Sequence, residues 1–419
     1  MDIEKITASL KNASSKLALQ TASQKNEALL SVSSSIEKNR KIILEANALD
    51  VKNARERGMS ESLVERLSLD DKKIDSIIDS FKLIISQTDP VGEEIAGWKT
   101  PAGMTIRQVR VPLGVVAIIY ESRPNVTADA FALAYKSGNS ILLRGSSSAI
   151  NSNLALEKAI KHGRKNAKNG IDEAISLAPC KNHEEVEQIL TAVGKVDVAL
   201  PRGGAKLINM VVQTAKIPVI QTGAGICHLY VDESADLEMA LNIAWNAKTQ
   251  RPGACNAIET IVVNEKILNQ FIPRLVEKFA GKVELRLDEK SYKSVQNVQN
   301  SAKIKKAADE DFGFEFLDFI CSVKTVSDLD EAIDFINSHN TKHSECIVTN
   351  NRQNSRIFQS KIDAACVYVN ASTRFTDGGE FGFGAELGIS TQKLHARGPM
   401  GIKALTTTKY LIDGDGQIR

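Results

Sequence analysis

The sequence has no paired cysteines, no long apolar run and no excess of charge of one sign. Its six cysteines, at positions 180, 227, 255, 321, 346 and 366, form no Cys-x-x-Cys pair in a chain of 419 residues. Scattered thiols of this kind indicate a reducing compartment and argue against a disulfide framework. No stretch reaches the roughly 18 to 20 uncharged apolar residues that a membrane span requires. The start of the chain also lacks the basic n-region of a secretory signal. We therefore expect a cytoplasmic protein with no membrane partner.

The balance of charge excludes a further class of partner. The chain carries 53 basic and 51 acidic side chains, a net charge of +2, which gives no electrostatic reason to expect nucleic acid. Hydrophobic residues make up 42% and charged residues 25%, as in ordinary globular proteins and unlike disordered or collagen-like chains. At roughly 150 residues per domain, the length predicts two or three domains, and we expect an enzyme.

Residues 1–95 have the pattern of helices throughout. Apolar residues recur at spacings of three and four, as at Ile74, Ile77 and Phe81, and Asp89-Pro90 ends the region. Such a layer cannot bury its apolar stripes alone, so we expect it to pack on the domain that follows.

Two α/β domains follow the helices. Short apolar runs at 115–120, 140–144, 174–177, 196–200, 217–220 and 229–231 alternate mostly with helical segments, which indicates a parallel sheet covered on both faces. We assign this first domain to residues 112–236. A helix at 237–248 and strands at 258–263, 316–323, 345–348 and 366–369 indicate a second α/β domain at 237–395.

Two extended segments have no obvious place in these domains. Residues 96–111 are typical of a β-hairpin that turns at Pro101-Ala102-Gly103, and the tail at 396–419 also alternates. We expect both segments to pair with strands of a partner subunit, which would make the protein a homo-oligomer.

Cys255 is the strongest candidate for a reactive residue. It follows a Pro-Gly turn, and Lys248 and Arg251 lie within seven residues. Nearby positive charge favours the thiolate, which is the nucleophilic form of cysteine. The alternative is an inert buried cysteine, which we expect of the other five. The polar approach through Gln250-Arg251-Pro252-Gly253 favours exposure of Cys255.

Three other segments follow predicted strands or hold several glycines. Arg202-Gly203-Gly204 opens a helix, so it fits either a phosphate site or a plain strand-to-helix turn. Asn125 can donate to a developing oxyanion or cap a helix. The loop from Arg374 to residue 384 holds four glycines, which suits close approach of the backbone to a ligand.

A dinucleotide loop and a metal site are poorly supported. The turn at Gly223-Ala224-Gly225 is followed by His228 where the dinucleotide fingerprint requires glycine. His339 and His343 are four residues apart, but the segment lacks the Glu of a zinc-protease helix. We therefore expect no metal.

Four motifs resemble one known family. Residues 246–260 (NAKTQRPGACNAIET), 111–126 (VPLGVVAIIYESRPNV), 375–382 (FTDGGEFG) and 390–401 (STQKLHARGPMG) closely resemble segments of the glutamate-5-semialdehyde dehydrogenases, also called γ-glutamyl phosphate reductases. These enzymes are a branch of the aldehyde dehydrogenase superfamily. The resemblance implies an aldehyde dehydrogenase-like α/β fold with two open α/β domains, a helical N-terminal region and a β-type oligomerisation arm.

The resemblance also implies a reaction: NADPH-dependent reduction of L-glutamyl 5-phosphate to glutamate 5-semialdehyde and phosphate, the second step of proline biosynthesis. Cys255 would form a thioester with release of phosphate, and Asn125 with the Cys255 backbone N–H would stabilise the oxyanion. Lys248, Arg251 and Arg374 would bind the substrate's phosphate or carboxylate. Glutamate 5-kinase would be a pathway partner.

Two departures from the wider superfamily bear on water and on the cofactor. The general-base Glu of hydrolytic relatives has Gln221 as its apparent equivalent, and an amide cannot take a proton from water at neutral pH. Arg144-Gly145-Ser146 replaces a frequent Lys-Pro-Ser, and the absence of an acid there favours NADP, with Arg144 beside the 2′-phosphate. Arg202, Gly203 and Gly204 would add cofactor contacts, and Glu315 would bind the nicotinamide ribose.

One alternative shares the nucleophile. Another acylating aldehyde dehydrogenase, acting on a CoA thioester or a different acyl phosphate, would also use Cys255. The acyl acceptor in the reverse reaction distinguishes the two hypotheses.

Overall fold

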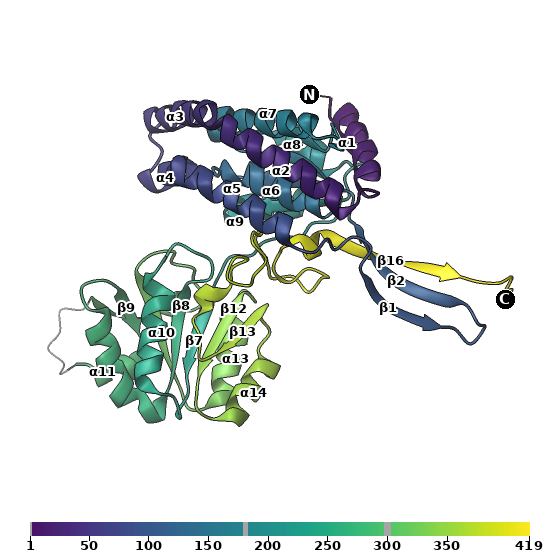
Figure 1. Ribbon diagram of the computed structural model, residues 1–419. Coiled ribbons are helices and arrows are strands. Elements are labelled where there is room, and N and C mark those ends of the chain that lie inside the picture. The colour runs from purple at the N-terminus through teal and green to yellow at the C-terminus, as the bar shows by residue number, and fades with distance from the viewer. Residues whose placement is uncertain (1, 179–182, 297–302) are drawn as a thin grey trace. The chain divides into compact units, whose positions relative to one another are not determined.

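The computed structural model describes residues 2–178, 183–296 and 303–419, and the chain forms two compact units. The first unit comprises Met1–Thr222, Phe381–Gly388 and Leu394–Arg419, and the second comprises Gly223–Glu380 and Ile389–Lys393. Each unit has its own sheet and core (Figure 1).

The first unit is built on a parallel four-stranded sheet. Its order is β5 (Ile175–Leu177), β4 (Ser140–Arg144), β3 (Val115–Tyr120) and β6 (Val198–Arg202). Every residue of β3 is buried, because successive side chains point to opposite faces and helices cover both faces. The predicted strands at 115–120 and 140–144 are confirmed.

The N-terminal helices complete the cover of this sheet, as the apolar spacing predicted. On one face α2 (Ala22–Lys38) and α5 (Asp71–Ser86) pack with α6 (Asn125–Lys136) and α7 (Ile150–Asn166). On the other face α1 (Ile3–Leu17) packs with α8 (His183–Leu190) and α9 (Ala205–Thr214). The remaining N-terminal helices are α3 (Arg40–Glu56) and α4 (Glu61–Leu67).

The second unit holds a parallel seven-stranded sheet in the order β10-β9-β11-β8-β7-β12-β13. The strands are β7 (Cys227–Val231), β8 (Ile258–Asn264), β9 (Glu284–Leu287), β10 (Ile304–Lys306), β11 (Ile320–Val326), β12 (Ser344–Val348) and β13 (Cys366–Val369). One face is covered by α10 (Leu237–Thr249) and α11 (Leu268–Phe279), with α12 (Glu289–Ser294) following β9. The other face is covered by α13 (Leu329–His339) and α14 (Arg352–Lys361).

Three sequence predictions about strands need correction, and two strands were not predicted. The run at 217–220 makes only one isolated bridge, from Val219 to Ala199. The run at 229–231 is part of β7, which pairs with β8 and β12, so the second unit begins at Gly223 and not at 237. The strand expected at 316–323 begins only at Ile320, and β9 and β10 were not predicted.

The two extended segments pair with each other in this chain. Strand β2 (Thr105–Pro112) lies between β1 (Glu94–Lys99) and β16 (Thr406–Asp413), and both pairings are antiparallel (Figure 1). The turn between β1 and β2 includes Gly103 at a φ of 88°, a conformation that favours glycine. Pairing with a partner subunit stays a prediction. Among the described residues, no helix has the length and apolar character needed to cross a membrane.

Candidate active site

Cys255 lies in a tight turn between α10 and β8. Backbone hydrogen bonds from Ala254 to Arg251 and from Ala257 to Ala254 close this turn, and Cys255 is half-buried within it. The other described cysteines, at 227, 321, 346 and 366, are buried, as predicted, and Cys180 lies outside the described residues. Burial raises the pKa of the Cys321 and Cys346 thiols to about 12. Among the described cysteines, only Cys255 combines a turn position with partial exposure.

The strand-to-turn segment before β7 packs directly on the Cys255 backbone. A Cβ on Gly225 would lie 1.5 Å from the Cys255 carbonyl oxygen, so no other residue fits there. The thiol of Cys227 donates to the same oxygen at 3.3 Å. The Gly225 N–H donates to the Glu315 carboxylate at 2.7 Å. The glycine turn therefore allows close packing against the Cys255 backbone, and Glu315 supports that turn.

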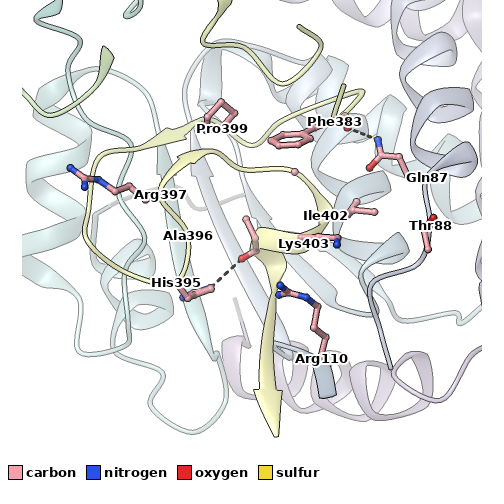
Figure 2. A pocket seen from close by; sticks show the side chains of 12 residues that line it. Gln87, Thr88, Arg110, Phe383, His395, Ala396, Arg397, Pro399, Ile402 and Lys403 are labelled. Atoms are coloured by element: carbon pink, nitrogen blue, oxygen red, sulfur yellow. Dashed lines mark hydrogen bonds between the residues drawn. The ribbon is translucent and has the colours of Figure 1, made fainter. Parts of the chain in front are cut away.

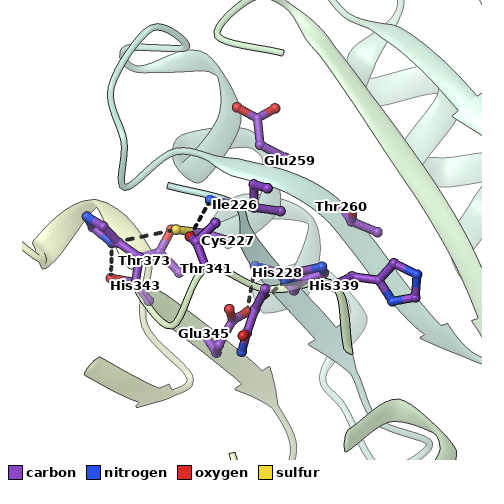
Figure 3. Close-up of polar contacts among 12 residues, drawn as sticks. Ile226, Cys227, His228, Glu259, Thr260, His339, Thr341, His343, Glu345 and Thr373 are labelled. Atoms are coloured by element: carbon purple, nitrogen blue, oxygen red, sulfur yellow. Dashed lines mark hydrogen bonds and ion pairs between the residues drawn. The ribbon is translucent and has the colours of Figure 1, made fainter. Parts of the chain in front are cut away.

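A layer of buried polar contacts surrounds β7 and β12. Figure 3 shows Cys227 beside His343, 3.8 Å from Sγ to Nδ1, and His228 beside Glu345, 3.0 Å from Nδ1 to Oε2. Burial lowers the pKa of His343 to about 4, so this imidazole is neutral near pH 7. A neutral ring cannot supply positive charge to Cys227, and burial raises the pKa of that thiol.

Lys248 points away from solvent and is committed to another partner. Its Nζ lies 2.6 Å from Glu259 Oε2, and both side chains are fully buried. Burial raises the pKa of Glu259 to about 7, and the Lys248 charge opposes that rise. This buried ion pair favours a structural role for Lys248 over contact with a substrate phosphate. Lys248 is therefore left out of the substrate-binding set proposed below.

Two guanidinium groups accompany Cys255 in the second unit. Burial lowers the pKa of half-buried Arg374, the charge of Arg251 lowers it further, and the thiolate form of Cys255 opposes both effects. The Arg374 Nε donates to Gln250 Oε1 at 3.0 Å, which fixes the plane of the guanidinium. Arg251 is exposed. The arrangement places positive charge where an anionic substrate group could bind beside a thiolate.

Asn256 connects the glycine-rich loop to the Cys255 turn. Its Nδ2 donates to the carbonyl of Thr376 at 2.9 Å, and its own carbonyl accepts from the Thr373 hydroxyl at 2.7 Å. Sequence reasoning missed Asn256 and Gln250. Their positions on either side of the Arg251–Cys255 stretch were the only available signal, because the partners lie more than 100 residues away.

In the first unit, the carboxyl ends of β3, β4 and β6 form the sheet edge where open α/β folds bind ligands. Arg144 ends β4 and is half-buried, and a Cβ on Gly145 would lie 2.2 Å from Asn153 Nδ2. The hydroxyls of Ser146 and Ser122 each contact Ser148, at 2.8 and 2.9 Å. The end of β4 therefore carries the guanidinium of Arg144, with the hydroxyls of Ser122, Ser146 and Ser148 close together beside it.

The turn at Arg202-Gly203-Gly204 is already occupied by acidic side chains. The Gly204 N–H at the start of α9 donates to Glu121 Oε2 at 2.9 Å, and Arg202 lies 4.0 Å from Glu386. A carboxylate on the helix amide opposes a phosphate at the same position. This geometry favours the plain strand-to-helix turn over the phosphate loop.

Asn125 is the first residue of α6, and the N-cap is Pro124. Its side chain makes no cap; its Nδ2 donates to Asp129 Oδ2 at 3.0 Å. The capping alternative is therefore excluded.

A separate cavity of about 430 Å³ lies in the first unit (Figure 2). Arg110, Phe383, His395, Arg397 and Lys403 are among its lining residues. No residue predicted for catalysis or cofactor binding lines it.

Comparison with known proteins identifies the class. A model of the aldehyde dehydrogenase family matches residues 1–312 and 295–410. An acetylating aldehyde dehydrogenase from Geobacillus thermoglucosidasius, 16% identical, has the same fold with a TM-score of 0.67 over all of this chain and 97% of that one. The chain belongs to the aldehyde dehydrogenase family, and the expected fold class is confirmed.

Within that family the similarity is narrower. A γ-glutamyl phosphate reductase of Lachnospira eligens is 50% identical over 100% of this chain and 99% of its own length. Another, from Kosmotoga olearia, is 49% identical over 98% of each chain. The crystal structure of γ-glutamyl phosphate reductase from Thermotoga maritima is 45% identical, with a TM-score of 0.95 over 100% of both chains. The chain thus belongs to the γ-glutamyl phosphate reductases, an oxidoreductase branch, as its four motifs predicted.

Proposed function

We propose that this enzyme reduces L-glutamyl 5-phosphate to L-glutamate 5-semialdehyde with NADPH, the second step of proline biosynthesis. The observation that supports this most is the half-buried Cys255 in a turn with Arg251 and Arg374 nearby. A thiolate needs access to an electrophile, and an acyl phosphate needs positive charge to bind and to leave.

The Cys255 sulfur attacks the acyl carbon, the C–O bond to phosphate breaks, and phosphate departs with the bonding electrons. The product is a thioester on Cys255. NADPH, when bound, would supply the hydride that reduces this thioester. The Cys255 sulfur then leaves as the thiolate when the C–S bond breaks, and the semialdehyde is released. Gln221 replaces a general base, so water does not compete effectively for the thioester.

Asn125 and the Cys255 backbone N–H supply the two donors for the tetrahedral oxyanion. Arg251 and Arg374 bind the substrate's anionic groups, and Gln250 holds Arg374 in plane. Arg374 is the better anchor of the two, because its guanidinium is half-buried and already oriented.

The residues at the carboxyl end of β4 fit the 2′-phosphate of NADP. The Arg144 guanidinium and the hydroxyls of Ser146 and Ser148 are there, and a carboxylate that would prefer NAD is absent from the 144–148 stretch. Glu315 can bind the nicotinamide ribose only if its carboxylate accepts hydrogen bonds from the Gly225 N–H and from a ribose hydroxyl at the same time. The turn at Arg202, Gly203 and Gly204 is a weaker candidate for cofactor binding. Glu121 already accepts from the Gly204 N–H, and Glu386 already lies beside Arg202.

The remaining proposals concern localisation, oligomeric state and a partner enzyme. Free thiols suit the cytoplasm, and the β1-β2-β16 sheet suits a homo-oligomer. Because acyl phosphates are unstable in water, we also propose glutamate 5-kinase as the enzyme that hands over the substrate.

The test is the reverse reaction with pyrroline-5-carboxylate, the cyclised form of the semialdehyde. We expect reduction of NADP that depends on inorganic phosphate, with slower reduction of NAD. Replacement of phosphate by CoA should give no activity. Activity with CoA and none with phosphate would instead show another acylating aldehyde dehydrogenase.

A further inference from the structure

The side-chain amide of Asn125 hydrogen-bonds to the carboxylate of Asp129, one helical turn later on α6. The distance from Asn125 Nδ2 to Asp129 Oδ2 is 3.0 Å. Residues four apart on a helix share a face, so the helix itself sets this pairing. Both side chains are half-buried.

The contact determines which way the Asn125 amide faces. An ionised carboxylate only accepts hydrogen bonds, so it binds the NH2 group of Asn125 and not its carbonyl oxygen. One N–H is used by Asp129, and the second N–H of the same group stays available to an oxyanion. With the amide reversed, the side-chain oxygen would replace that donor and repel the developing negative charge.

Burial raises the pKa of Asp129, and two neighbouring groups oppose that rise. The hydroxyl of Ser80 on α5 and the guanidinium of Arg202 at the end of β6 both favour the charged form. Gly388 leaves room for this guanidinium, because a Cβ there would lie 2.4 Å from Arg202 Nη1. Glu386, 4.0 Å from Arg202, is the other acid beside this cation.

We infer that Asp129 is a positioning residue that orients the Asn125 amide for oxyanion stabilisation. The inference rests on the proposed catalytic role of Asn125 and extends it to a residue that makes no contact with the reacting atoms.

A pH dependence follows from this arrangement. Burial raises the pKa of Asp129 to about 6, and Asn125, Ser80 and Arg202 limit that rise. Above pH 6 the Asp129 carboxylate accepts a hydrogen bond from the Asn125 NH2 group. Below pH 6 the protonated carboxyl group can donate to the Asn125 amide oxygen, so the amide is no longer held in one orientation. Turnover should therefore fall as the pH drops through 6.

The experiment is a double-mutant cycle between Asp129→Asn and Asn125→Ala, measured as phosphate-dependent NADP reduction. Loss of one oxyanion donor costs about 100-fold in turnover, so we expect that loss for Asn125→Ala. Asp129→Asn should lower turnover about 10-fold at pH 8 with KM nearly unchanged, and it should abolish the decline centred near pH 6. Asp129→Glu should restore part of the rate and the pH dependence. Phosphate groups titrate near pH 6 themselves, so each profile is compared with the unmodified enzyme at every pH.

The cycle separates the possible failures. In the Asn125→Ala background, Asp129→Asn should have no further effect on turnover. An equal loss in both backgrounds, together with a lower melting temperature, would show a structural role and overturn the inference. Full activity of Asp129→Asn alone would also overturn it. Full activity of Asn125→Ala would refute the proposed oxyanion role and the inference with it.

Discussion

Arg374 is the side chain on which the proposed substrate recognition depends most. Arg374→Gln keeps a polar side chain but shortens it and removes the charge and the paired N–H donors. Hydrogen bonds to charged groups are worth about 1.5–3 kcal/mol, which corresponds to a rise of about 10- to 100-fold in KM for phosphate. We expect a smaller effect on turnover at saturating phosphate. Steady-state kinetics of the reverse reaction would measure both.

The matched control is Arg352→Gln, which removes an exposed guanidinium from α14 in the same unit. It should leave KM unchanged. If both variants raise KM equally, the effect comes from net charge, and the assignment of Arg374 is wrong.

Sequence reasoning proposed the reactive residues from local patterns, but it could not predict the residues that contact and support them. Cys255 was predicted from local charge and a Pro-Gly turn, which are properties of adjacent residues. Lys248 was placed at the substrate on the same basis, but its partner Glu259 lies in β8, and only the fold reveals that pair. The role of Gly225 likewise depends on the approach of a backbone 30 residues away. Such contacts leave no local pattern in the sequence.

At the level of elements, the three-stranded sheet of β1, β2 and β16 leaves large apolar side chains in solvent. Trp98 and Tyr410 are 45% and 56% exposed and meet edge to face, with Ile95 and Ile412 exposed as well. Apolar groups gathered on one element mark an interaction surface. We expect the double variant Trp98→Asp and Tyr410→Asp to dissociate the oligomer, measured by light scattering after size exclusion.

A control on another surface is Leu19→Asp, which adds a charge at an exposed apolar residue in the turn after α1. It should keep the oligomer intact. An unmodified chain that is monomeric, or a double variant of unchanged mass, would contradict an oligomerisation role for this sheet.

Strands were predicted well where both faces are buried. All residues of β3 and β8 are buried, so their apolar runs were visible without any partner. The run at 217–220 is also largely apolar, but it makes only a single bridge. It was predicted as a strand because a buried loop and a buried strand have similar sequences. Strand β9 has only two fully buried residues and was missed.

At the scale of the whole molecule, chain order did not reveal which sheet β7 joins. It follows the first domain in sequence but pairs with β8 and β12, so the boundary moves to Gly223. The C-terminal segments Phe381–Gly388 and Leu394–Arg419 return to the first unit in the same way. Periodicity predicts elements, whereas assignment to a sheet depends on long-range pairing.

The central claim is that Cys255 carries the acyl group and that phosphate, not water, releases it. The most direct measurement is the absorbance of NADPH in the first turnover with pyrroline-5-carboxylate and NADP, with phosphate left out. We predict a burst of NADPH stoichiometric with enzyme subunits, little further turnover until phosphate is added, and no burst with Cys255→Ala, which should still bind NADPH. Continued turnover without phosphate, or a burst that survives Cys255→Ala, would contradict the account.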